Sequence, residues 1–193
     1  MAYLPREQRR TAIVDAAVRV ARRSGLAGIT ARTVALEVQG SPGLIHQHFA
    51  SVTELQAAAW QTYVAEQVAG FTEDARNPTA DPILEFFANH LDPRAAPDLG
   101  LWADAWAHAL RVPAFAPAYA DSLDLVAAVL QSSSPGMDLA EARRSMLLAV
   151  ALAGMSRIAP ERYAPELITD VVADAAGRSV RRRGDRGSET PAD

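Results

Sequence analysis

The nine residues SPGLIHQHF, at positions 41–49, decide the fold of this chain. Ser41 is a favourable helix N-cap, and Pro42 fits the first turn because the N–H that proline lacks has no partner there. Ile45 and Phe49 are four residues apart, so both lie on one face of the helix that follows. The stretch therefore predicts a short helix to about residue 49, anchored by two apolar side chains.

A second short helix is predicted immediately before this one. Thr30 is a good N-cap, and Val34, Ala35 and Val38 recur at helical spacing over residues 31–38. Residues 39–42 leave a short turn between the two helices. Two short helices joined by such a turn have the dimensions of a helix-turn-helix motif.

A longer amphipathic helix precedes the motif, and Gly25 ends it. Its apolar face consists of Ile13, Ala16, Ala17 and Val20, whereas the other faces carry Arg9, Arg10, Arg19, Arg22 and Arg23. These arginines suit either an ordinary solvated face or, next to a helix-turn-helix, contacts to DNA phosphates. Next to the helix-turn-helix, the basic side chains favour a nucleic-acid partner.

The helix at 41–49 has an outer face suited to a DNA groove. Its candidates for outward positions are Pro42, Gly43, Leu44, His46 and Gln47. Pro42 and Gly43 are small, so the free N–H groups at the helix N-terminus can approach a phosphate or a base edge closely.

Residues 9–55 resemble the DNA-binding domain of the TetR family of transcriptional regulators, and the run at 41–49 is the most specific part. The matching residues are Arg10, Ile13, Ala16, Ala17, Gly25, Thr30, Val34, Ala35, Ser41, Gly43, Ile45, His48, Phe49 and Leu55. The resemblance implies a three-helix DNA-binding head on a six-helix body for ligand binding and dimerisation. It also implies a dimer that binds a palindromic operator and is released by a small molecule.

The resemblance assigns roles to individual residues of the head. It implies phosphate or groove contacts near the N-termini of the two short helices, base-facing residues at 42–44, and a phosphate contact at His48. His46 stands where the family usually has Tyr. The complete set of predicted DNA contacts is Arg9, Arg10, Thr30, Arg32, Thr33, Ser41, Pro42, Gly43, Leu44, His46, Gln47 and His48.

Three positions depart from the family pattern. In the turn, the family has Gly and then an apolar residue, where this chain has Gln39 and Gly40. A positive φ at Gln39 would cost about 1 kcal/mol. Val52 replaces the customary Lys at the start of the fourth helix, which removes one phosphate contact.

The formal net charge of −4 hides an uneven distribution along the 193 residues. Residues 1–50 hold seven Arg and three acidic residues, whereas residues 51–177 hold seven Arg and seventeen acidic residues. A basic head that can contact DNA is thus joined to an acidic body. The absence of Cys excludes disulfide frameworks, Cys-ligated metals and thiol nucleophiles.

The rest of the chain also shows helical spacing, which predicts an all-α protein with nine helices. The body helices are expected at 52–75, from Asp81-Pro82 through Leu91, at 98–111, from after Pro113 to about Gln131, at 138–157 and at 165–177, with loops at 92–97 and 132–136. We predict a helix-turn-helix domain at 6–50 and a ligand-binding and dimerisation domain at 51–177. Residues 178–193 are expected to form a disordered Arg-rich tail.

The body offers large apolar side chains for a ligand cavity. Trp102 and Trp106 share a helical face, which suits either core packing or a cavity wall. The predicted ligand-binding residues are Phe86, Phe87, His90, Trp102, Trp106, Phe115, Tyr119, Met146 and Met155. Polar groups that could orient a ligand are His90, Asp104, His108 and Arg111. Such a pocket would take an apolar or amphipathic compound.

The last two predicted helices are apolar enough for the core or a dimer interface. The resemblance implies that they pair between two copies in a four-helix bundle. The predicted interface residues are Leu147, Val150, Ala151, Gly154, Leu167 and Val171.

Together these features predict a homodimeric regulator of transcription, in keeping with a repressor, with no enzymatic activity and no cofactor. A helical enzyme using His90, Asp104, His108 or Glu85 lacks a nucleophile–base or metal-ligand motif. A dimer that acts through protein partners without specific DNA binding is the other alternative, supported by Gln39, Gly40 and Val52.

His46 and His48 point about 200° apart on a helix, so no metal site is expected. Without a membrane-spanning apolar run or a signal peptide core, the chain is expected in the cytoplasm.

Overall fold

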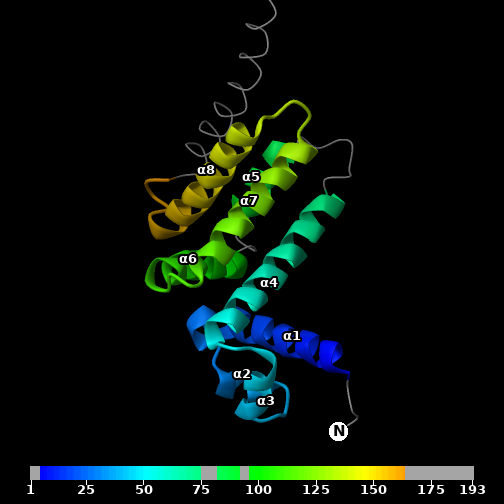
Figure 1. Ribbon diagram of the computed structural model, residues 1–193. Coiled ribbons are helices and arrows are strands. Elements are labelled where there is room, and N and C mark those ends of the chain that lie inside the picture. The colour runs from blue at the N-terminus through cyan, green and yellow to red at the C-terminus, as the bar shows by residue number, and fades with distance from the viewer. Residues whose placement is uncertain (1–4, 75–81, 92–95, 164–193) are drawn as a thin grey trace, which may run out of the picture. The chain divides into compact units, whose positions relative to one another are not determined.

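The computed structural model describes residues 5–74, 82–91 and 96–163, and all regular structure in these ranges is helical (Figure 1). The elements are α1 (Arg6–Ser24), the 3-10 turn η1 (Leu26–Gly28), α2 (Ala31–Glu37), α3 (Pro42–His48), α4 (Val52–Asp74), α5 (Pro82–Leu91), α6 (Ala96–Arg111), α7 (Ala116–Ser133) and α8 (Leu139–Ile158). The predicted all-α fold and its three-helix head are confirmed. The helix predicted at 165–177 and the tail at 178–193 lie outside the described residues.

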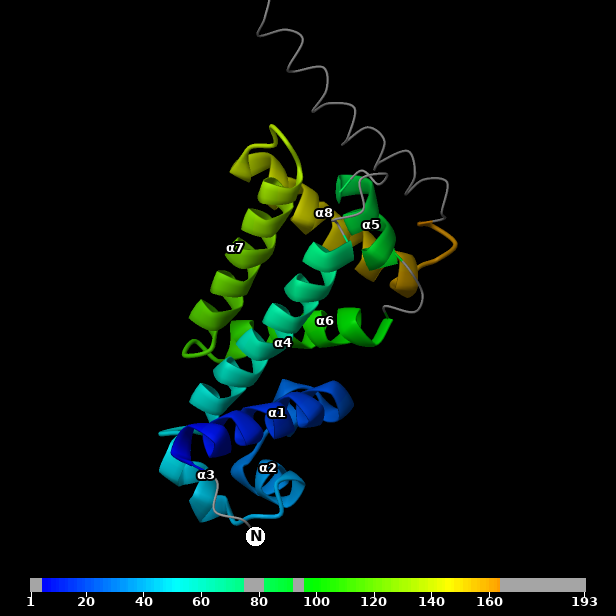
Figure 2. The same ribbon diagram turned by 90° about the vertical axis from the view of Figure 1, so that its right-hand side faces the viewer.

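The chain divides into two compact units. The first comprises residues 1–70 and 96–124, and the second comprises residues 71–95 and 125–193. In the first unit, α1 contacts α2, η1 and α6, and α2 contacts α3. Figures 1 and 2 show α1, α2 and α3, which we call the head, grouped at the N-terminal end of α4. The head therefore shares one unit with most of α4 and with α6.

Helix α1 buries the face that its sequence predicts. Ile13, Ala16 and Ala17 are fully buried, and Val20 is nearly so. Gly25 follows the helix with φ 71° and donates its N–H to the carbonyl of Ala21 at 2.8 Å. Positive φ is the conformation that glycine adopts at little cost, so the predicted end of the helix is confirmed.

Both short helices begin at the predicted caps. The Thr30 hydroxyl accepts the N–H of Thr33 at 3.1 Å, and the Thr33 hydroxyl accepts the N–H of Thr30 at 2.9 Å, which forms a reciprocal capping box. The Ser41 hydroxyl accepts the N–H of Leu44 at 3.3 Å, and Pro42 occupies the first position of α3. These caps satisfy N–H groups that the helices themselves leave unpaired.

The turn between α2 and α3 forces Gln39 into the left-handed region, with φ 53°. Among the described residues it is the only non-glycine residue with positive φ. Gly40 follows it, and a Cβ at Gly40 would meet Leu44 Cδ2 at 2.9 Å. The strain expected for this departure from the family turn is therefore present.

Gln39→Gly is expected to raise the free energy of unfolding by about 0.5–1 kcal/mol. Glycine relieves the left-handed strain but loses part of the gain because it is more flexible in the unfolded chain. Urea denaturation of the two proteins measures the difference, and an unchanged or lower midpoint for the variant would contradict it.

Two predicted loops are shorter than expected. Helix α6 begins at Ala96, so Pro97, which was predicted in the loop at 92–97, lies in its first turn, where the missing N–H of proline costs no hydrogen bond. Helix α7 continues to Ser133, although 132–136 was predicted as a loop. Ser132 is tolerated in the last turn because its hydroxyl donates to the carbonyl of Val129 at 2.9 Å. Serine and proline residues thus indicate that a helix end is near, but they do not determine the residue at which the helix begins or ends.

The first unit has an aromatic centre at Trp60 of α4. Trp60 is 1% exposed, and its ring centroid lies 4.7 Å from that of Trp102, 5.5 Å from Tyr63 and 5.9 Å from Tyr119. Its indole N–H donates to the hydroxyl of Ser122 at 3.0 Å. This cluster joins α4, α6 and α7 within the unit.

The second unit is built on the packing of α5 against α8. Phe86 and Phe87 of α5 are buried, and Phe71 at the end of α4 lies edge-on to Phe86 at 5.9 Å. The buried face of α8 consists of Ala142, Met146, Ala149, Leu152 and Ala153. None of the helices in the described ranges is long and apolar enough to span a membrane.

Candidate nucleic-acid interface

Helix α3 separates its anchors from its free face, as the sequence predicts. Ile45 and Phe49 are 1% and 2% exposed. Pro42, Gly43, His46 and Gln47 are exposed, and Leu44 and His48 are partly exposed. The free face thus gathers the residues predicted to read DNA on one short helix, although their contacts to DNA remain a prediction.

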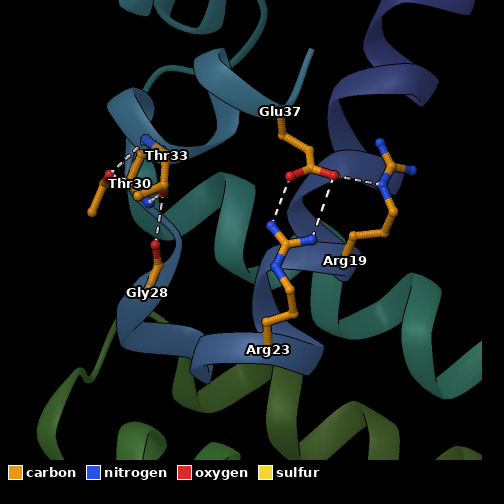
Figure 3. A network of polar contacts seen from close by, with 6 residues as sticks. All are labelled: Arg19, Arg23, Gly28, Thr30, Thr33 and Glu37. Atoms are coloured by element: carbon orange, nitrogen blue, oxygen red, sulfur yellow. Dashed lines mark hydrogen bonds and ion pairs between the residues drawn. The ribbon is translucent and has the colours of Figure 1, made fainter. Parts of the chain in front are cut away.

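Thr30 and Thr33, two of the predicted DNA contacts, hydrogen-bond to each other and to the turn before α2 (Figure 3). The Thr33 hydroxyl donates to the carbonyl of Gly28 at 2.7 Å, so its one proton is used inside the head. Thr30 is exposed, and its hydroxyl accepts the Thr33 N–H. Because the Thr33 proton goes to Gly28, the Thr30 hydroxyl is the donor in the 3.0 Å contact between the two hydroxyls, so both side chains serve mainly to shape the start of α2.

Glu37 of α2 holds two arginines of α1 (Figure 3). Its carboxylate accepts from Arg19 Nε at 2.9 Å and from Arg23 at 2.7 Å. Hydrogen bonds from Arg23 and Arg19 lower the pKa of Glu37 to about 2. Arg22 pairs with Glu66 of α4 at 2.9 Å. For these three arginines the structure favours a role within the protein.

Arg10 also makes contacts within the protein. Its guanidinium donates to the backbone carbonyl of His48 at 2.6 Å and to Glu54 at 3.3 Å, and lies 4.0 Å from the ring centroid of Phe49. These contacts hold the end of α3 against α1. Arg9, in contrast, has no side-chain hydrogen bond or ion pair within the described ranges, and exposed Arg32 has none either. Arg9 and Arg32 are the arginines best placed to contact phosphates.

His48 lies in a positive environment. Its partial burial, together with the charges of Arg6, Arg9 and Arg10, lowers its pKa below the ordinary value of 6.5, and Glu7 opposes this. The imidazole is therefore neutral at pH 7 and can donate one ring N–H. An anion beside these arginines would be attracted without needing a charged His48.

The sequence did not reveal how α6 is tied to the head. Asp104 of α6 accepts the backbone N–H of Leu26 at 2.6 Å. Gln56 of α4 donates its amide to the carbonyls of Leu26 and Ile29, at 3.0 and 3.5 Å, which leaves its oxygen to accept from His108 Nε2 at 3.2 Å. Asp104 holds the turn that leads into α2 directly, and His108 does so through Gln56; the prediction that they orient a ligand stays a prediction. Their spacing of four residues shows that they share a helical face, yet nothing in the sequence shows what that face contacts.

Below pH 6.5 the protein is expected to lose stability partly through His108. Burial lowers the pKa of His108, with Arg111 acting in the same direction and Asp104 against it. Because the folded pKa lies below the unfolded value, the contribution is complete above pH 6.5 and is lost as the pH falls through the folded pKa. Melting temperatures at pH 7.5, 6.5 and 5.5 should fall less steeply in His108→Gln, and the same decline in both proteins would refute this role.

The predicted ligand-binding residues fall in both units. Trp102 and Tyr119 are partly exposed members of the aromatic cluster around Trp60, and buried Phe115 packs edge-on against His108 at 5.0 Å. Phe86, Phe87 and Met146 are buried in the second unit, and Met155 is partly exposed there. Trp106 is 56% exposed, and the side chain of His90 lies outside the described residues. A common cavity for these residues stays a prediction.

The predicted interface residues of α8 include exposed ones. Leu147 is 57% exposed, Ala151 is exposed, and Val150 and Gly154 are partly exposed. Leu167 and Val171 lie outside the described residues. The exposed apolar face of α8 is compatible with the predicted interface, which stays a prediction.

Solved structures with the same fold include a member of the TetR family. The chain is 26% identical to a member of the TetR family from Streptomyces coelicolor A3, covering 87% of this chain and 98% of that one at a TM-score of 0.63. Its fold is that of the TetR family, which confirms the resemblance found at residues 9–55. No protein-family model matches the sequence, and no curated protein sequence matches it.

Another TetR-like neighbour is the multidrug binding protein EbrR. In complex with proflavin it is 26% identical over 86% of this chain and 99% of its own, with a TM-score of 0.66. In complex with ethidium it is 27% identical over 86% and 98%, with a TM-score of 0.69. These neighbours support a role for the present chain in the regulation of transcription.

Proposed function

We propose that this TetR-family protein is a homodimeric repressor that binds a palindromic operator through α3 of each head. The observation that carries the proposal is the division of α3 into buried anchors, Ile45 and Phe49, and an exposed face that ends beside Arg9 and His48. The two-fold symmetry of a dimer matches the symmetry of a palindromic site. The exposed apolar residues of α8, Leu147 among them, support its use in dimerisation.

A small apolar or amphipathic molecule is proposed to release the operator. The partly exposed rings of Trp102 and Tyr119 support an aromatic ligand, and the structural neighbour EbrR is known in complex with proflavin, ethidium and imidazole. A ligand that binds better when the heads are wrongly spaced for DNA shifts the population away from the binding form. Helix α4 joins the head to the body. Asp104 and His108 of α6 would transmit the conformational change in the body to the head. No reaction is proposed.

Gel shifts on DNA surrounding the protein's own gene test the DNA-binding proposal. We expect a specific complex that weakens as salt rises, because phosphate contacts release counterions. Gln47→Ala should change the preference between operator variants by about 1–3 kcal/mol, since Gln47 faces outward on α3. An equal loss on every sequence would count against base reading by Gln47. An intact dimer without any specific complex would favour the alternative, a family member that acts through protein partners.

A further inference from the structure

The turn after α2 ends the helix in a Schellman motif. The N–H of Gln39 donates to the carbonyl of Leu36 at 3.2 Å. The N–H of Gly40 donates to the carbonyl of Ala35 at 2.8 Å, and Gln39 has the positive φ that this motif places just past the helix end. In such motifs the residue after the left-handed one commonly makes an apolar contact with the last turn of the helix. Gly40 occupies that position and has no side chain to make the contact.

Leu44 of α3 fills the place that Gly40 leaves empty. A Cβ at Gly40 would lie 2.9 Å from Leu44 Cδ2 and 3.4 Å from Val38 Cγ2. Because a Cβ is bonded to its own Cα, the Leu44 methyl group must lie against the backbone of Gly40. The carbonyl and the hydroxyl of Ser41 accept the N–H of Leu44 at 3.0 and 3.3 Å, which fixes the backbone from which this side chain starts. Leu44 is accordingly only partly exposed.

The neighbours of Leu44 on α3 face outward more freely. His46 and Gln47 are exposed, and so is Gly43. A Cβ at Gly43 would meet the Ser41 hydroxyl at 3.7 Å, an ordinary van der Waals distance. A leucine methyl group that packs on the turn after α2 is not available to a base edge. Leu44, predicted as a base-facing residue, therefore differs from the other members of that set.

We propose that Leu44 is a positioning residue for DNA binding. By packing on Gly40 it fixes the direction in which α3 leaves α2, while His46 and Gln47 face the bases. The proposal rests on the proposed function, because it divides the tasks within the helix that binds the operator. Phosphate contacts near the start of α2 and base contacts along α3 form together only when the two short helices keep one relative orientation.

A volume-conserving swap tests the contact in the full-length protein. Leu44→Ala removes the filling side chain, and Gly40→Val supplies a new one at the same place, so the double variant keeps the number of side-chain carbons. Gly40 is not among the glycines with positive φ, so valine needs no strained backbone there. Leu44→Ala should lower the melting temperature by about 2–4 °C. The losses of the two single variants should not add, and the double variant should melt above Leu44→Ala. Additive losses would overturn the proposal.

Gel shifts performed well below the melting temperature separate positioning from a purely structural role, since every variant is folded there. Leu44→Ala should weaken binding about fivefold, and equally on the operator and on each of its single-base variants. The double variant should regain most of this affinity. Gln47→Ala, in contrast, should change the preference between the operator variants. Unchanged affinity or an altered base preference in Leu44→Ala would overturn the proposal.

Leu36→Ala is the matched control for stability, because it makes the same change in the same motif at a side chain that is 71% exposed. Its melting temperature should lie within about 1 °C of the wild type. A fall as large as that of Leu44→Ala would show that the loss does not come from the contact with Gly40.

The melts contain no DNA, so they distinguish the failure of this proposal from that of the proposed function. A wild type without a specific complex would refute the proposed function and, with it, the positioning role, even if the melts show that Leu44 and Gly40 are coupled. A specific complex together with additive losses in the melts would leave the repressor in place and refute the positioning contact alone.

Discussion

Trp60→Ala is expected to lower the free energy of unfolding by about 4 kcal/mol. Replacing a fully buried Trp by Ala removes its transfer free energy and leaves a cavity, together worth about 3–5 kcal/mol. Trp60 also contacts three aromatic rings and donates a hydrogen bond to Ser122. Ser122 keeps a partner after the change, because its hydroxyl donates to the carbonyl of Tyr119 at 2.6 Å. Urea denaturation followed by circular dichroism measures the loss.

Trp106→Ala is the control, because it removes the same side chain from a position that is 56% exposed. A surface change of this kind is expected to alter the free energy of unfolding by about 0.5 kcal/mol or less. If Trp106 belongs to the ligand site, its variant should lose ligand affinity while it keeps its stability. Similar losses of stability in the two variants would contradict the burial of Trp60 at the centre of the aromatic cluster.

Arg10→Ala is expected to weaken both folding and DNA binding. The charged hydrogen bond to the His48 carbonyl and the contact with Phe49 together contribute about 2 kcal/mol, allowing for the partial exposure of the guanidinium. Without them, the end of α3 is free to move relative to α1, so DNA affinity falls even where Arg10 contacts no phosphate. Chemical denaturation and gel shifts over a range of salt concentrations measure the two effects.

Arg9→Ala separates the two roles of the basic residues on α1. Arg9 has no polar side-chain contact within the described residues, so its removal should leave the unfolding midpoint nearly unchanged. It should weaken binding to all DNA sequences and reduce the slope of log affinity against log salt by about 1. A larger loss of stability in Arg9→Ala than in Arg10→Ala would reverse the assigned roles.

The elements of the head could be predicted because their determinants are local. The side chains of Thr30 and Ser41 cap their helices by accepting the N–H of the residue three positions later. Ile45 and Phe49 lie on one buried face because they are four residues apart. The strain at Gln39 was also foreseeable, since it follows from comparing one turn with the family pattern. Such features need only a few consecutive residues, and a single sequence contains them in full.

The partners of the charged side chains could not be predicted, because they join residues far apart in the chain. Arg10 reaches Glu54, and Asp104 reaches the N–H of Leu26, 78 residues away. The sequence shows that these side chains are charged and share helical faces, but their partners depend on how the helices pack.

The close approach of Gly25 and Asp104 carries an evolutionary consequence. A Cβ at Gly25 would lie 2.7 Å from the Asp104 carboxylate, and the φ of 71° already disfavours any other residue there. A related protein with a side chain at position 25 must therefore change both the turn and the residue at position 104. We expect these two positions to covary among homologues, with Asp at 104 occurring where position 25 is Gly.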